Sequence, residues 1–510
     1  MKVFFIYPSA GSQLGFNYGV AHMASVLKQS GHQVSFWQLC EDIEPLPTEE
    51  QFSARLLKEK PDILAFSVVT NQWPYTQTLA RWARRKLSIP FVLGGIHALV
   101  AAEEILRTGL FDYVFRGECE ESFLEFVEKL HRKENVENVR NLAFAHNGQI
   151  KINPVRPLPD VTRLPPKDYQ SMDFQKMIDA KNGWVGLMAS RGCPFFCTYC
   201  FNHVMVQSYR KDLNCTFRQL NYIRQFGVDK IIQEIEYLLK TYRNIKMFIF
   251  DDDLFTFDKS YVKRFCQAYK KVCSIPFVIN AHVGFFDDQC ARYLAEANCK
   301  IVKFGVESGS PKIRSKILNR HMTNEKIIEA IKTAGKYRMH SSVFLIIGFP
   351  HEGRQDVFET IKLMAAAKPG RFRWTYFFPF PGTKAHQISL DGGYINFEKM
   401  KGLKNFTDES CLEFGSEQNL LLKKIGRIMP WFVNAYSELP VAGFYADKIK
   451  EILAMDEGQW NKAAPNLLEK DKEYSGRHCE NGLSHYAVKY NPFMGVISDY
   501  FLNDDPQREL

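Results

Sequence analysis

The chain has 510 residues, 45% hydrophobic and 24% charged, which is typical of a folded globular protein and excludes a disordered one. One hydrophobic core rarely serves such a length, so we expect about three domains. The 12 cysteines are scattered apart from one cluster, which excludes a disulfide framework, and the net charge of +9 is not concentrated in a Lys/Arg run of the kind that binds nucleic acid.

Residues 1–135 alternate between apolar strand patterns and helical patterns. The helical periodicity is clearest over residues 18–29. The expected strands cover residues 3–7, 34–37, 63–69, 91–93 and 113–115. Strands that alternate with helices predict a doubly wound, Rossmann-like parallel sheet.

The segments that follow these strands contain the candidate binding residues. Gly94, Gly95 and His97 follow the fourth strand, and Gly117 and Glu118 follow the fifth. Ligands bind such sheets at the carboxyl ends of the strands, and glycine lets the backbone approach a large ligand closely. No GxGxxG motif follows the first strand, so a dinucleotide site is not supported. His97 is more typical of a loop or helix residue than of a metal ligand.

Residues 136–180 contain a hairpin pattern and a linker. The hairpin pattern covers residues 142–152. Five prolines follow between positions 154 and 166, and proline-rich segments act as extended spacers. The next domain is therefore expected to begin near residue 181.

A cysteine motif lies in residues 191–202, with Cys193, Cys197 and Cys200 in CxxxCxxC spacing. Three thiolates on a short loop can hold three irons of a 4Fe–4S cluster and leave the fourth iron open for a substrate. A zinc knuckle is the alternative, but structural zinc needs four ligands, usually as two pairs.

Residues 181–384 alternate between strands and helices again. An amphipathic helix is expected over residues 228–239. The expected strands cover residues 185–189, 247–250, 277–280, 301–306, 342–347 and 374–378. These strands end in polar or glycine-rich residues, which predicts a partial parallel barrel with its chemistry at the carboxyl end.

Three consecutive aspartates, at positions 251–253, follow the second of these strands. Carboxylates suit a hard divalent cation, but consecutive residues of an extended strand point to opposite sides. We expect one or two of them, with Asp252 or Asp253 preferred, to face the active site.

Residues 385–510 are expected to be mainly helical. Residues 420–436 mix basic and large apolar side chains and are interrupted by Pro430. Such a segment covers the barrel mouth or rests on a membrane surface, and covering is the preferred interpretation. Residues from 469 onward support no assignment.

The cysteine loop, with Tyr199 before its last cysteine, resembles that of the radical S-adenosylmethionine (SAM) superfamily. The order of Gly31-His-Gln-Val, Gly94-Gly-Ile-His-Ala and residues 112–118 is similar to the cobalamin-binding domain found before many of these enzymes. The resemblance implies a cobalamin-binding domain (1–135), a linker (136–180), a partial (β/α)6 radical SAM barrel (181–384) and a helical region (385–510). The cobalamin signature DxHxxG is absent, which implies that this domain gives cobalt no histidine.

The resemblance also implies roles for single residues. The three cysteines would hold the cluster, whose open iron binds SAM and whose electron releases a 5′-deoxyadenosyl radical. Glu307 would bind the ribose, Arg320 the methionine carboxylate, and Gly348 would leave room for the adenine. Further residues are expected to contact the cofactors: Tyr199 and Asp252 near SAM, and Gly94, Gly95, His97, Gly117 and Glu118 near cobalamin.

These features predict a cobalamin-dependent radical SAM enzyme that methylates an unactivated carbon. The alternatives are a radical cyclase, oxidase or carbon–carbon coupling enzyme, and a non-enzymatic cobalamin or iron–sulfur carrier. An RNA methylthiotransferase is rejected, because it needs three further cysteines in the first domain, which has only Cys40 and Cys119.

The expected partners are a small-molecule or lipid-like substrate, such as a tetrapyrrole, and an electron donor such as flavodoxin or ferredoxin, without nucleic acid. The first seven residues are too short an apolar run for a signal peptide, and no run is long enough to span a bilayer. We expect a cytoplasmic protein with peripheral contact to the inner membrane face as a further option.

Overall fold

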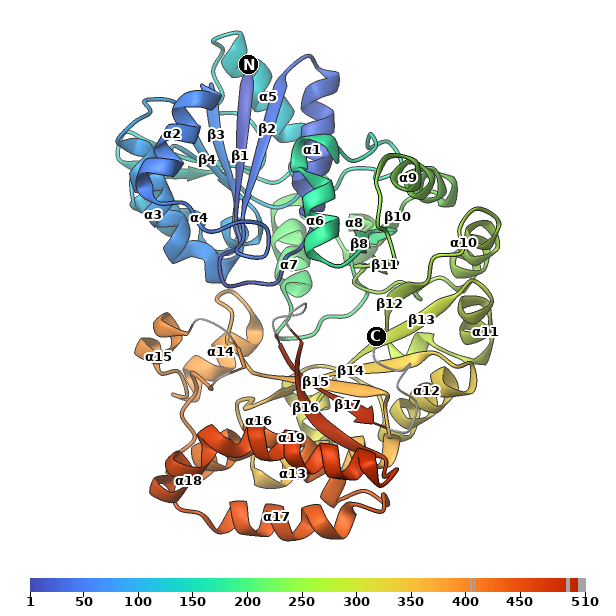
Figure 1. The fold of residues 1–510 in the computed structure, drawn as a ribbon. Coiled ribbons are helices and arrows are strands. Elements are labelled where there is room, and N and C mark those ends of the chain that lie inside the picture. Colours follow the sequence, from blue (N-terminus) through green and yellow to red (C-terminus); the bar gives the residue numbers. More distant parts are fainter. Residues whose placement is uncertain (404–405, 408, 492–495, 503–510) are drawn as a thin grey trace. The chain divides into compact units, whose positions relative to one another are not determined.

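The computed structural model describes residues 1–403, 406–407, 409–491 and 496–502. The chain forms two compact units (Figure 1). The first consists of residues 1–194 and 200–248, and the second of residues 195–199 and 249–510. Most strands of each sheet lie in one unit, and each unit is described by itself.

The sheet of the first unit has the order β2-β1-β3-β4-β5-β6-β7. Its parallel strands are β1 (Lys2–Pro8), β2 (Gln33–Leu39), β3 (Ile63–Ser67), β4 (Phe91–Gly94) and β5 (Tyr113–Phe115). These strands confirm the predicted doubly wound sheet. The order changes direction at β1 and β3, and in such sheets ligands bind at this point.

Helices cover both faces of this sheet. They are α1 (Tyr18–Gln29), α2 (Glu49–Glu59), α3 (Trp73–Arg84), α4 (Ile96–Arg107) and α5 (Glu120–His131). On one face Phe4 and Phe66 share a core with side chains of α2, α3 and α4. On the other face Phe5 packs against Phe123 of α5. The continuous apolar run of β1 therefore serves both faces, as a parallel sheet covered on both sides requires.

The hairpin of β6 (Leu142–His146) and β7 (Gln149–Ile152) extends this sheet, although the sequence placed it in the linker. Strand β6 pairs antiparallel with β5. Asn141, which is fully buried, donates its side-chain amide to Arg116 O at 2.7 Å. This contact joins residues distant in sequence, which local patterns do not reveal.

The first unit continues well past residue 135. After the proline-rich segment it contains α6 (Phe174–Ala180), β8 (Trp184–Leu187), β9 (Ser190–Arg191), α7 (Phe201–Leu213), α8 (Phe217–Leu220), β10 (Arg224–Gln225) and α9 (Val228–Thr241). Strands β9 and β10 form a short antiparallel ladder in which Arg191 is opposite Arg224. Helix α9 confirms the predicted amphipathic helix.

The second sheet has the order β16-β17-β15-β14-β13-β12-β11-β8. The strands expected for the barrel are present: β11 (Met247–Phe250), β12 (Phe277–Ala281), β13 (Cys299–Glu307), β14 (His340–Ile347) and β15 (Arg371–Tyr376), together with β8. Helices α10 (Lys259–Val272), α11 (Asp288–Glu296), α12 (Asn324–Lys336) and α13 (Arg354–Ala367) connect them. The sheet therefore confirms the predicted partial barrel of parallel strands.

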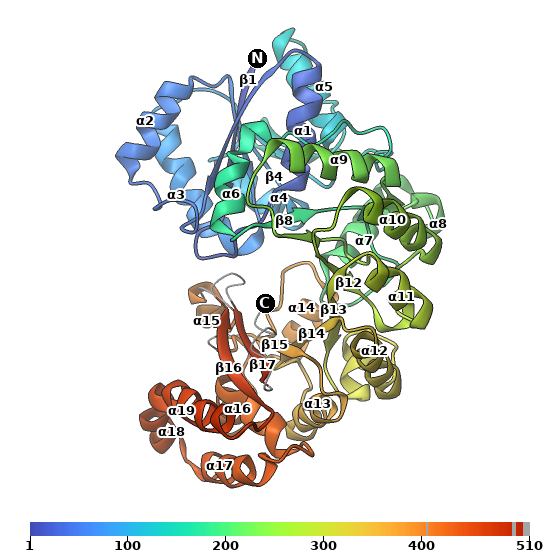
Figure 2. The same cartoon turned by 45° about the vertical axis from the view of Figure 1, so that its right-hand side comes forward.

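The C-terminal region is mainly helical, as predicted. Its helices are α14 (Lys384–Asp391), α15 (Phe397–Gly402), α16 (Ser416–Ala435), α17 (Ala442–Ala454), α18 (Glu457–Ala463) and α19 (Leu467–Glu480). Figure 2 shows α16 to α19 gathered beside β16. Two strands that the sequence left unassigned, β16 (His485–Asn491) and β17 (Val496–Leu502), add an antiparallel hairpin to the β15 edge.

Helix α16 contains Pro430, and its backbone departs from helical geometry at Ile428. Proline removes one helical hydrogen bond and crowds the preceding turn, which explains the kink. The large apolar side chains of this segment, including Trp431 and Phe432, are buried. Within the described ranges, no helix is long and apolar enough to cross a membrane.

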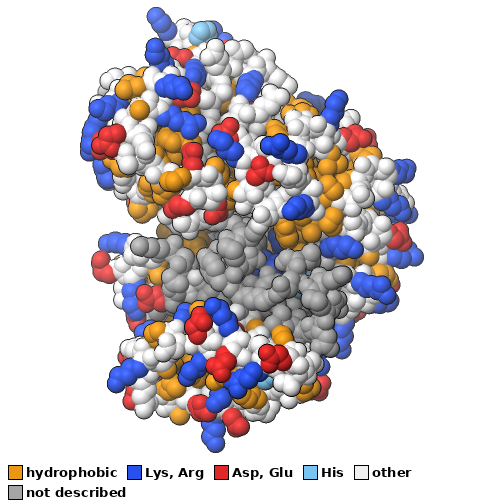
Figure 3. All heavy atoms as spheres, in the orientation of Figure 1, with side chains coloured by type: hydrophobic (Ala, Val, Ile, Leu, Met, Phe, Trp, Pro, Cys, Tyr) orange, Lys and Arg blue, Asp and Glu red, His pale blue; other side chains and the backbone are white. Residues whose placement is uncertain are grey.

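On the face in Figure 3, Lys and Arg side chains lie among acidic and apolar ones instead of forming one continuous patch. This distribution agrees with the absence of a dense basic run in the sequence.

Candidate functional site

The middle of the cysteine loop, Phe195–Tyr199, belongs to the second unit. Thr198 donates its backbone N–H to Leu318 O at 3.1 Å and its hydroxyl to Ile317 O at 2.6 Å. Asn319 donates its side-chain amide to Phe196 O at 2.9 Å. A π-helical turn (Ile313–Ile317) and the residues after it thus fix this part of the loop.

Arg320 lies directly beside the central cysteine. Its Nη1 is 3.4 Å from Cys197 Sγ and 3.4 Å from the Tyr199 hydroxyl, and its Nη2 donates to Gly305 O. A Cβ atom at Gly305 would lie 2.6 Å from Glu307 Oε1, so glycine is needed there to leave room for the carboxylate. The structure therefore brings together four of the site residues that the sequence predicted: Cys197, Tyr199, Glu307 and Arg320.

Burial and charge oppose each other in this group. Burial raises the pKa of Cys197 and that of Glu307, and the Arg320 guanidinium partly offsets both effects. Burial alone would lower the pKa of Arg320, but Tyr199, Glu307 and Cys197 raise it above its ordinary value. Arg320 is therefore a permanent cation beside a cysteine sulfur. A cation in this place suits the negative charge that thiolates bring to an iron–sulfur cluster, so the residues fit a 4Fe–4S cluster.

His282, which the sequence analysis did not assign, also lies at the cysteine loop. It follows β12, and its ring stacks on Phe195 with centroids 4.2 Å apart. Burial and the Arg320 charge lower the pKa of His282 to about 3, so the ring is neutral. Its Nδ1 accepts the Gly284 N–H at 3.1 Å, which leaves the proton on Nε2. The only signal in the sequence was its position after a strand.

Gly348 directly follows β14 and has φ +78°, a backbone conformation that favours glycine. Its N–H donates to Glu352 Oε2 at 2.5 Å, and Phe349 N donates to the same oxygen at 3.2 Å. Burial raises the pKa of Glu352 to about 8. Glu352 was not predicted, although it follows the strand by only five residues.

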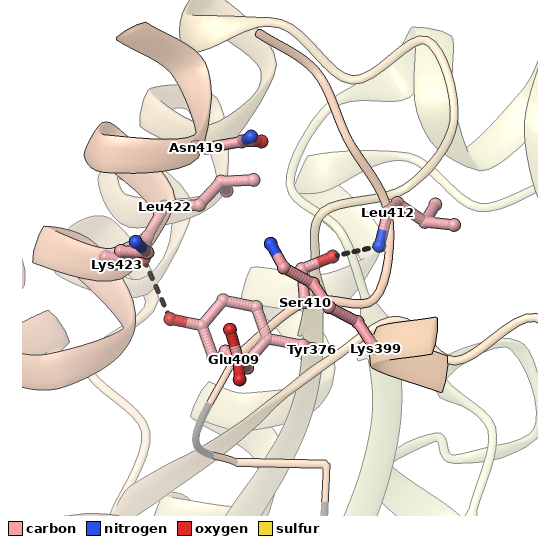
Figure 4. Close-up of a pocket in the computed structure, with 8 residues that line it drawn as sticks. All are labelled: Tyr376, Lys399, Glu409, Ser410, Leu412, Asn419, Leu422 and Lys423. Atoms are coloured by element: carbon pink, nitrogen blue, oxygen red, sulfur yellow. Dashed lines mark hydrogen bonds between the residues drawn. The ribbon is translucent and has the colours of Figure 1, made fainter. Parts of the chain in front are cut away.

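A small pocket of about 20 Å³ that opens to solvent adjoins this turn (Figure 4). A Cβ atom at Gly348 would lie 3.5 Å from Ser410 Oγ and 3.6 Å from Leu422 Cδ1. The residues that line it come from β15 and the C-terminal region: Tyr376, Lys399, Glu409, Ser410, Leu412, Asn419, Leu422 and Lys423. The Tyr376 hydroxyl donates to Leu422 O at 3.0 Å and holds α16 against the end of β15.

Of the aspartates after β11, Asp252 alone is buried, and Asn280 donates its side-chain amide to the Asp252 carbonyl at 2.9 Å. Asp251 and Asp253 are exposed, as expected for alternating directions. In the part of the chain that the structure describes, no three His, Cys, Asp or Glu side chains converge as a preformed metal site. The aspartate run is thus not assembled as a cation site.

The carboxyl edge of the first sheet is shaped by Gly95. Its φ is +92°, and a Cβ atom there would lie 2.6 Å from both N and O of Val68. His97 N donates to Val68 O at 3.1 Å. The Gly94-Gly95 turn therefore lets the start of α4 close against the end of β3, which only glycine allows.

Buried polar atoms gather at this edge. Among the described residues, both ring nitrogens of His97, Thr70 Oγ1 and Gln38 Oε1 have no hydrogen-bond partner. Burial lowers the pKa of His97 to about 4, so the ring is neutral. Unsatisfied buried groups are costly unless a ligand or water completes them. An amide-rich cofactor such as cobalamin fits an edge with this chemistry.

Gly117 and Glu118 have contacts other than those predicted. A Cβ atom at Gly117 would lie 2.4 Å from the Tyr209 hydroxyl oxygen. The Glu118 carboxylate is bound by Arg191 Nη1 at 2.7 Å and by Arg224 Nη2 at 2.5 Å. These partners lie 73 and 106 residues away, so spacing in the sequence could not identify them.

Two family models match the chain. The B12 binding domain covers residues 12–127, and the Radical SAM superfamily covers residues 187–364. An uncharacterised methyltransferase of Pyrococcus horikoshii is 28% identical over 80% of this chain and 89% of its own. The anaerobic magnesium-protoporphyrin IX monomethyl ester cyclase of Rubrivivax gelatinosus is 25% identical over 86% of this chain and 79% of its own.

Among solved structures, the radical SAM methyltransferase TsrM of Kitasatospora setae, with cobalamin and a 4Fe–4S cluster bound, has the same fold. The TM-score is 0.62 at 14% identity, over 76% of this chain and 78% of that one. The two matching domains in this order identify the family, and the cysteine loop and the sheet edge with unsatisfied buried polar atoms agree with it. The chain belongs to the radical SAM enzymes that carry a cobalamin-binding domain.

Proposed function

We propose that this chain is a cobalamin-dependent radical SAM methyltransferase that methylates an unactivated carbon of a small-molecule substrate. One observation carries the proposal: the same chain contains a cysteine loop backed by a cation, and a sheet edge whose buried polar atoms lack partners. The relationship to the Pyrococcus methyltransferase, which spans most of both chains, favours methyl transfer.

Cys193, Cys197 and Cys200 would hold the 4Fe–4S cluster. When the cofactors are bound, the cluster supplies the electron that cleaves SAM, and cobalamin supplies the methyl carrier. Glu307 would accept hydrogen bonds from the SAM ribose, because a carboxylate can accept from two hydroxyls. Arg320, which lies beside the Cys197 sulfur, would hold negative charge at the cysteine loop and bind the methionine carboxylate.

Further residues shape the two sites. Gly348 would leave space beside the end of β14. Asp252 is buried after β11, where its backbone carbonyl accepts from the Asn280 side chain. In the first unit, His97 offers a neutral ring that can donate one hydrogen bond and accept another. Gly95 lets the start of α4 close against Val68 and so shapes the sheet edge that cobalamin would meet.

A radical cyclase is the second candidate, favoured by the relationship to the Rubrivivax cyclase over 86% of this chain. Both candidates would use the cluster and SAM, but only methylation would need cobalamin as methyl carrier, so the cobalt content and the product decide between them. Under either candidate we expect a low-potential electron donor such as flavodoxin or ferredoxin, and a cytoplasmic location. A lipid-like or tetrapyrrole substrate is our proposal from the aromatic content of 14%.

The test begins with anaerobic purification in the presence of iron, sulfide and hydroxocobalamin. We expect one cluster and one corrinoid per chain, from iron, sulfide and cobalt analysis. Candidate substrates are then incubated with SAM deuterated in its methyl group, and the mass of the product is measured. A product that carries the deuterated methyl supports methyl transfer. A product without it, or a chain that never retains cobalt, refutes methylation and favours the cyclase.

Cys197→Ala tests the cluster assignment. We expect it to abolish reductive SAM cleavage, measured as 5′-deoxyadenosine, because a cluster ligand is removed. Cys215→Ala is the matched control, since Cys215 lies outside the motif. Cleavage by the Cys197 variant at the wild-type rate would contradict the assignment.

A further inference from the structure

We propose that residues 116–118, the loop after β5, form a clamp that sets the conformation of the cysteine loop from both sides. Glu118 is then a positioning residue for the cluster. The inference rests on the proposed function only in taking the three cysteines as cluster ligands. The family resemblance implied that Gly117 and Glu118 of this loop contact cobalamin; the clamp is a different role for the same loop.

The first half of the clamp acts before the cysteines. The Glu118 carboxylate lies between two guanidinium groups: Arg191 Nη1 is 2.7 Å from Oε2, and Arg224 donates to both oxygens at 2.5 and 3.0 Å. Glu120 Oε1 also contacts Arg191 Nη1 at 2.7 Å. The side chain of Glu118 is 15% exposed and that of Arg224 is 6% exposed. Because Arg191 precedes Cys193 by two residues, this ion pair fixes the start of the loop.

The backbone between Arg191 and Cys193 is also confined. Gly192 has φ +92°, and a Cβ atom there would lie 2.3 Å from Tyr222 O. The Tyr222 hydroxyl donates to Asn202 Oδ1 at 2.5 Å, and Asn202 Nδ2 lies 3.7 Å from Cys200 Sγ. The segment just before β10 is therefore linked to the last cysteine through the side chains of Tyr222 and Asn202.

The second half of the clamp acts after the cysteines, on α7, which begins at the residue next to Cys200. Arg116 Nη2 donates to Ser208 Oγ at 2.8 Å, and Arg116 Nη1 pairs with Asp212 Oδ2 at 3.1 Å. Glu118 N donates to the Tyr209 hydroxyl at 2.7 Å. The close approach of Gly117 to Tyr209 requires glycine at that position.

These contacts predict an electrostatic as well as a geometric effect. Burial alone would raise the pKa of Glu118, but Arg191 and Arg224 hold it below its ordinary value, so the carboxylate is charged. Removing one partner of a buried ion pair leaves the other charges uncompensated. Without the carboxylate, the net positive charge near Cys193 increases, and positive charge favours the more negative, reduced form of a cluster.

Glu118→Gln tests the clamp, because glutamine keeps the size of the side chain and removes its charge. Glu121→Gln is the matched control: Glu121 pairs with Arg156 at 3.2 Å on the same domain, but its side chain is 63% exposed. Both variants and the wild type are reconstituted with iron and sulfide, without substrate or cobalamin. The measurements are iron retained per chain, the electron paramagnetic resonance (EPR) signal of the reduced cluster, and its midpoint potential.

We expect Glu118→Gln to shift the midpoint potential in the positive direction, to change the EPR signal and to lower iron retention severalfold, while Glu121→Gln matches the wild type. A Glu118 variant that melts at a lower temperature but keeps the wild-type signal and potential would show a merely structural role and overturn the clamp. If Glu118→Gln does not fold, Tyr209→Phe decides: an altered EPR signal supports the clamp, and an unaltered one overturns it. Because no readout depends on methyl transfer, failure of the proposed function leaves this test intact.

Discussion

Glu352→Gln tests the effect of burial on the carboxyl group at the turn after β14. Glu352 Oε2 accepts two backbone N–H groups, but its Oε1 has no hydrogen-bond partner among the described residues, and the side chain is 4% exposed. Burial raises the pKa of this carboxyl from 4.5 to about 8. Since the folded-state pKa exceeds the unfolded-state value, the folded protein binds more protons, and its stability decreases as the pH rises from about 4.5 to about 8.

The size of the effect follows from the shift. One pKa unit corresponds to about 1.4 kcal/mol, so the ionisation of Glu352 costs the wild type about 2 to 3 kcal/mol more at pH 7.5 than at pH 5.5. Glutamine does not ionise and still offers an acceptor oxygen to Gly348 N. For a unit of this size, the difference in melting temperature between variant and wild type should increase by roughly 5 to 10 °C over that range.

The assay is thermal unfolding of both proteins at several pH values between 5.5 and 7.5. Glu359→Gln, at a half-buried position of α13, is the control, and its melting temperature should differ from that of the wild type by the same amount at every pH. If the difference in melting temperature between Glu352→Gln and the wild type does not change with pH, burial does not raise the pKa of this carboxyl, and the reasoning is refuted.

Two further predictions concern packing. Gly95→Ala should lower the melting temperature and the cobalt retained per chain, because its Cβ would lie 2.6 Å from Val68 atoms. Gly31→Ala is the control: Gly31 has φ +83° but no atom within 4 Å of the added Cβ, so this variant has only the backbone strain. Equal losses in both variants would contradict the crowding argument. Trp431→Ala should cost about 3 to 5 kcal/mol in urea unfolding, since the ring is 1% exposed. Phe397→Ala, 53% exposed, should change stability by less than about 0.5 kcal/mol, and a similar cost for both would show that α16 is not part of the core.

Much of the fold followed from local patterns. The helix at residues 18–29 and the strand at 113–115 have the predicted bounds in α1 and β5. Apolar runs of strand length and helical periodicity are short-range signals, because they reflect the burial of one segment at a time. The cysteine spacing is equally local, and it predicted the family before any geometry was considered.

The candidate site was predictable only in part. Glu307 and Arg320 do lie near Cys197, but the role of Arg320 beside the sulfur, at 3.4 Å, was not foreseen. His282 and Glu352 were missed because one histidine or glutamate after a strand is common and has no distinguishing neighbours. Their stacking and burial exist only once the strands are assembled.

The sequence by itself determined the order of the cobalamin-binding and radical SAM domains, the cysteine motif and therefore the cofactor class, since each depends on residues close together in the chain. It did not determine the bounds of the compact units, the first of which reaches residue 248. The tertiary structure alone decided which side chains pair across long separations. Glu118 meets Arg191 and Arg224 across 73 and 106 residues, the hairpin of β6 and β7 joins β5, and β17 joins β15. Such pairings depend on which segments the fold brings side by side, and periodicity along the chain gives the buried face of one segment but not its neighbour.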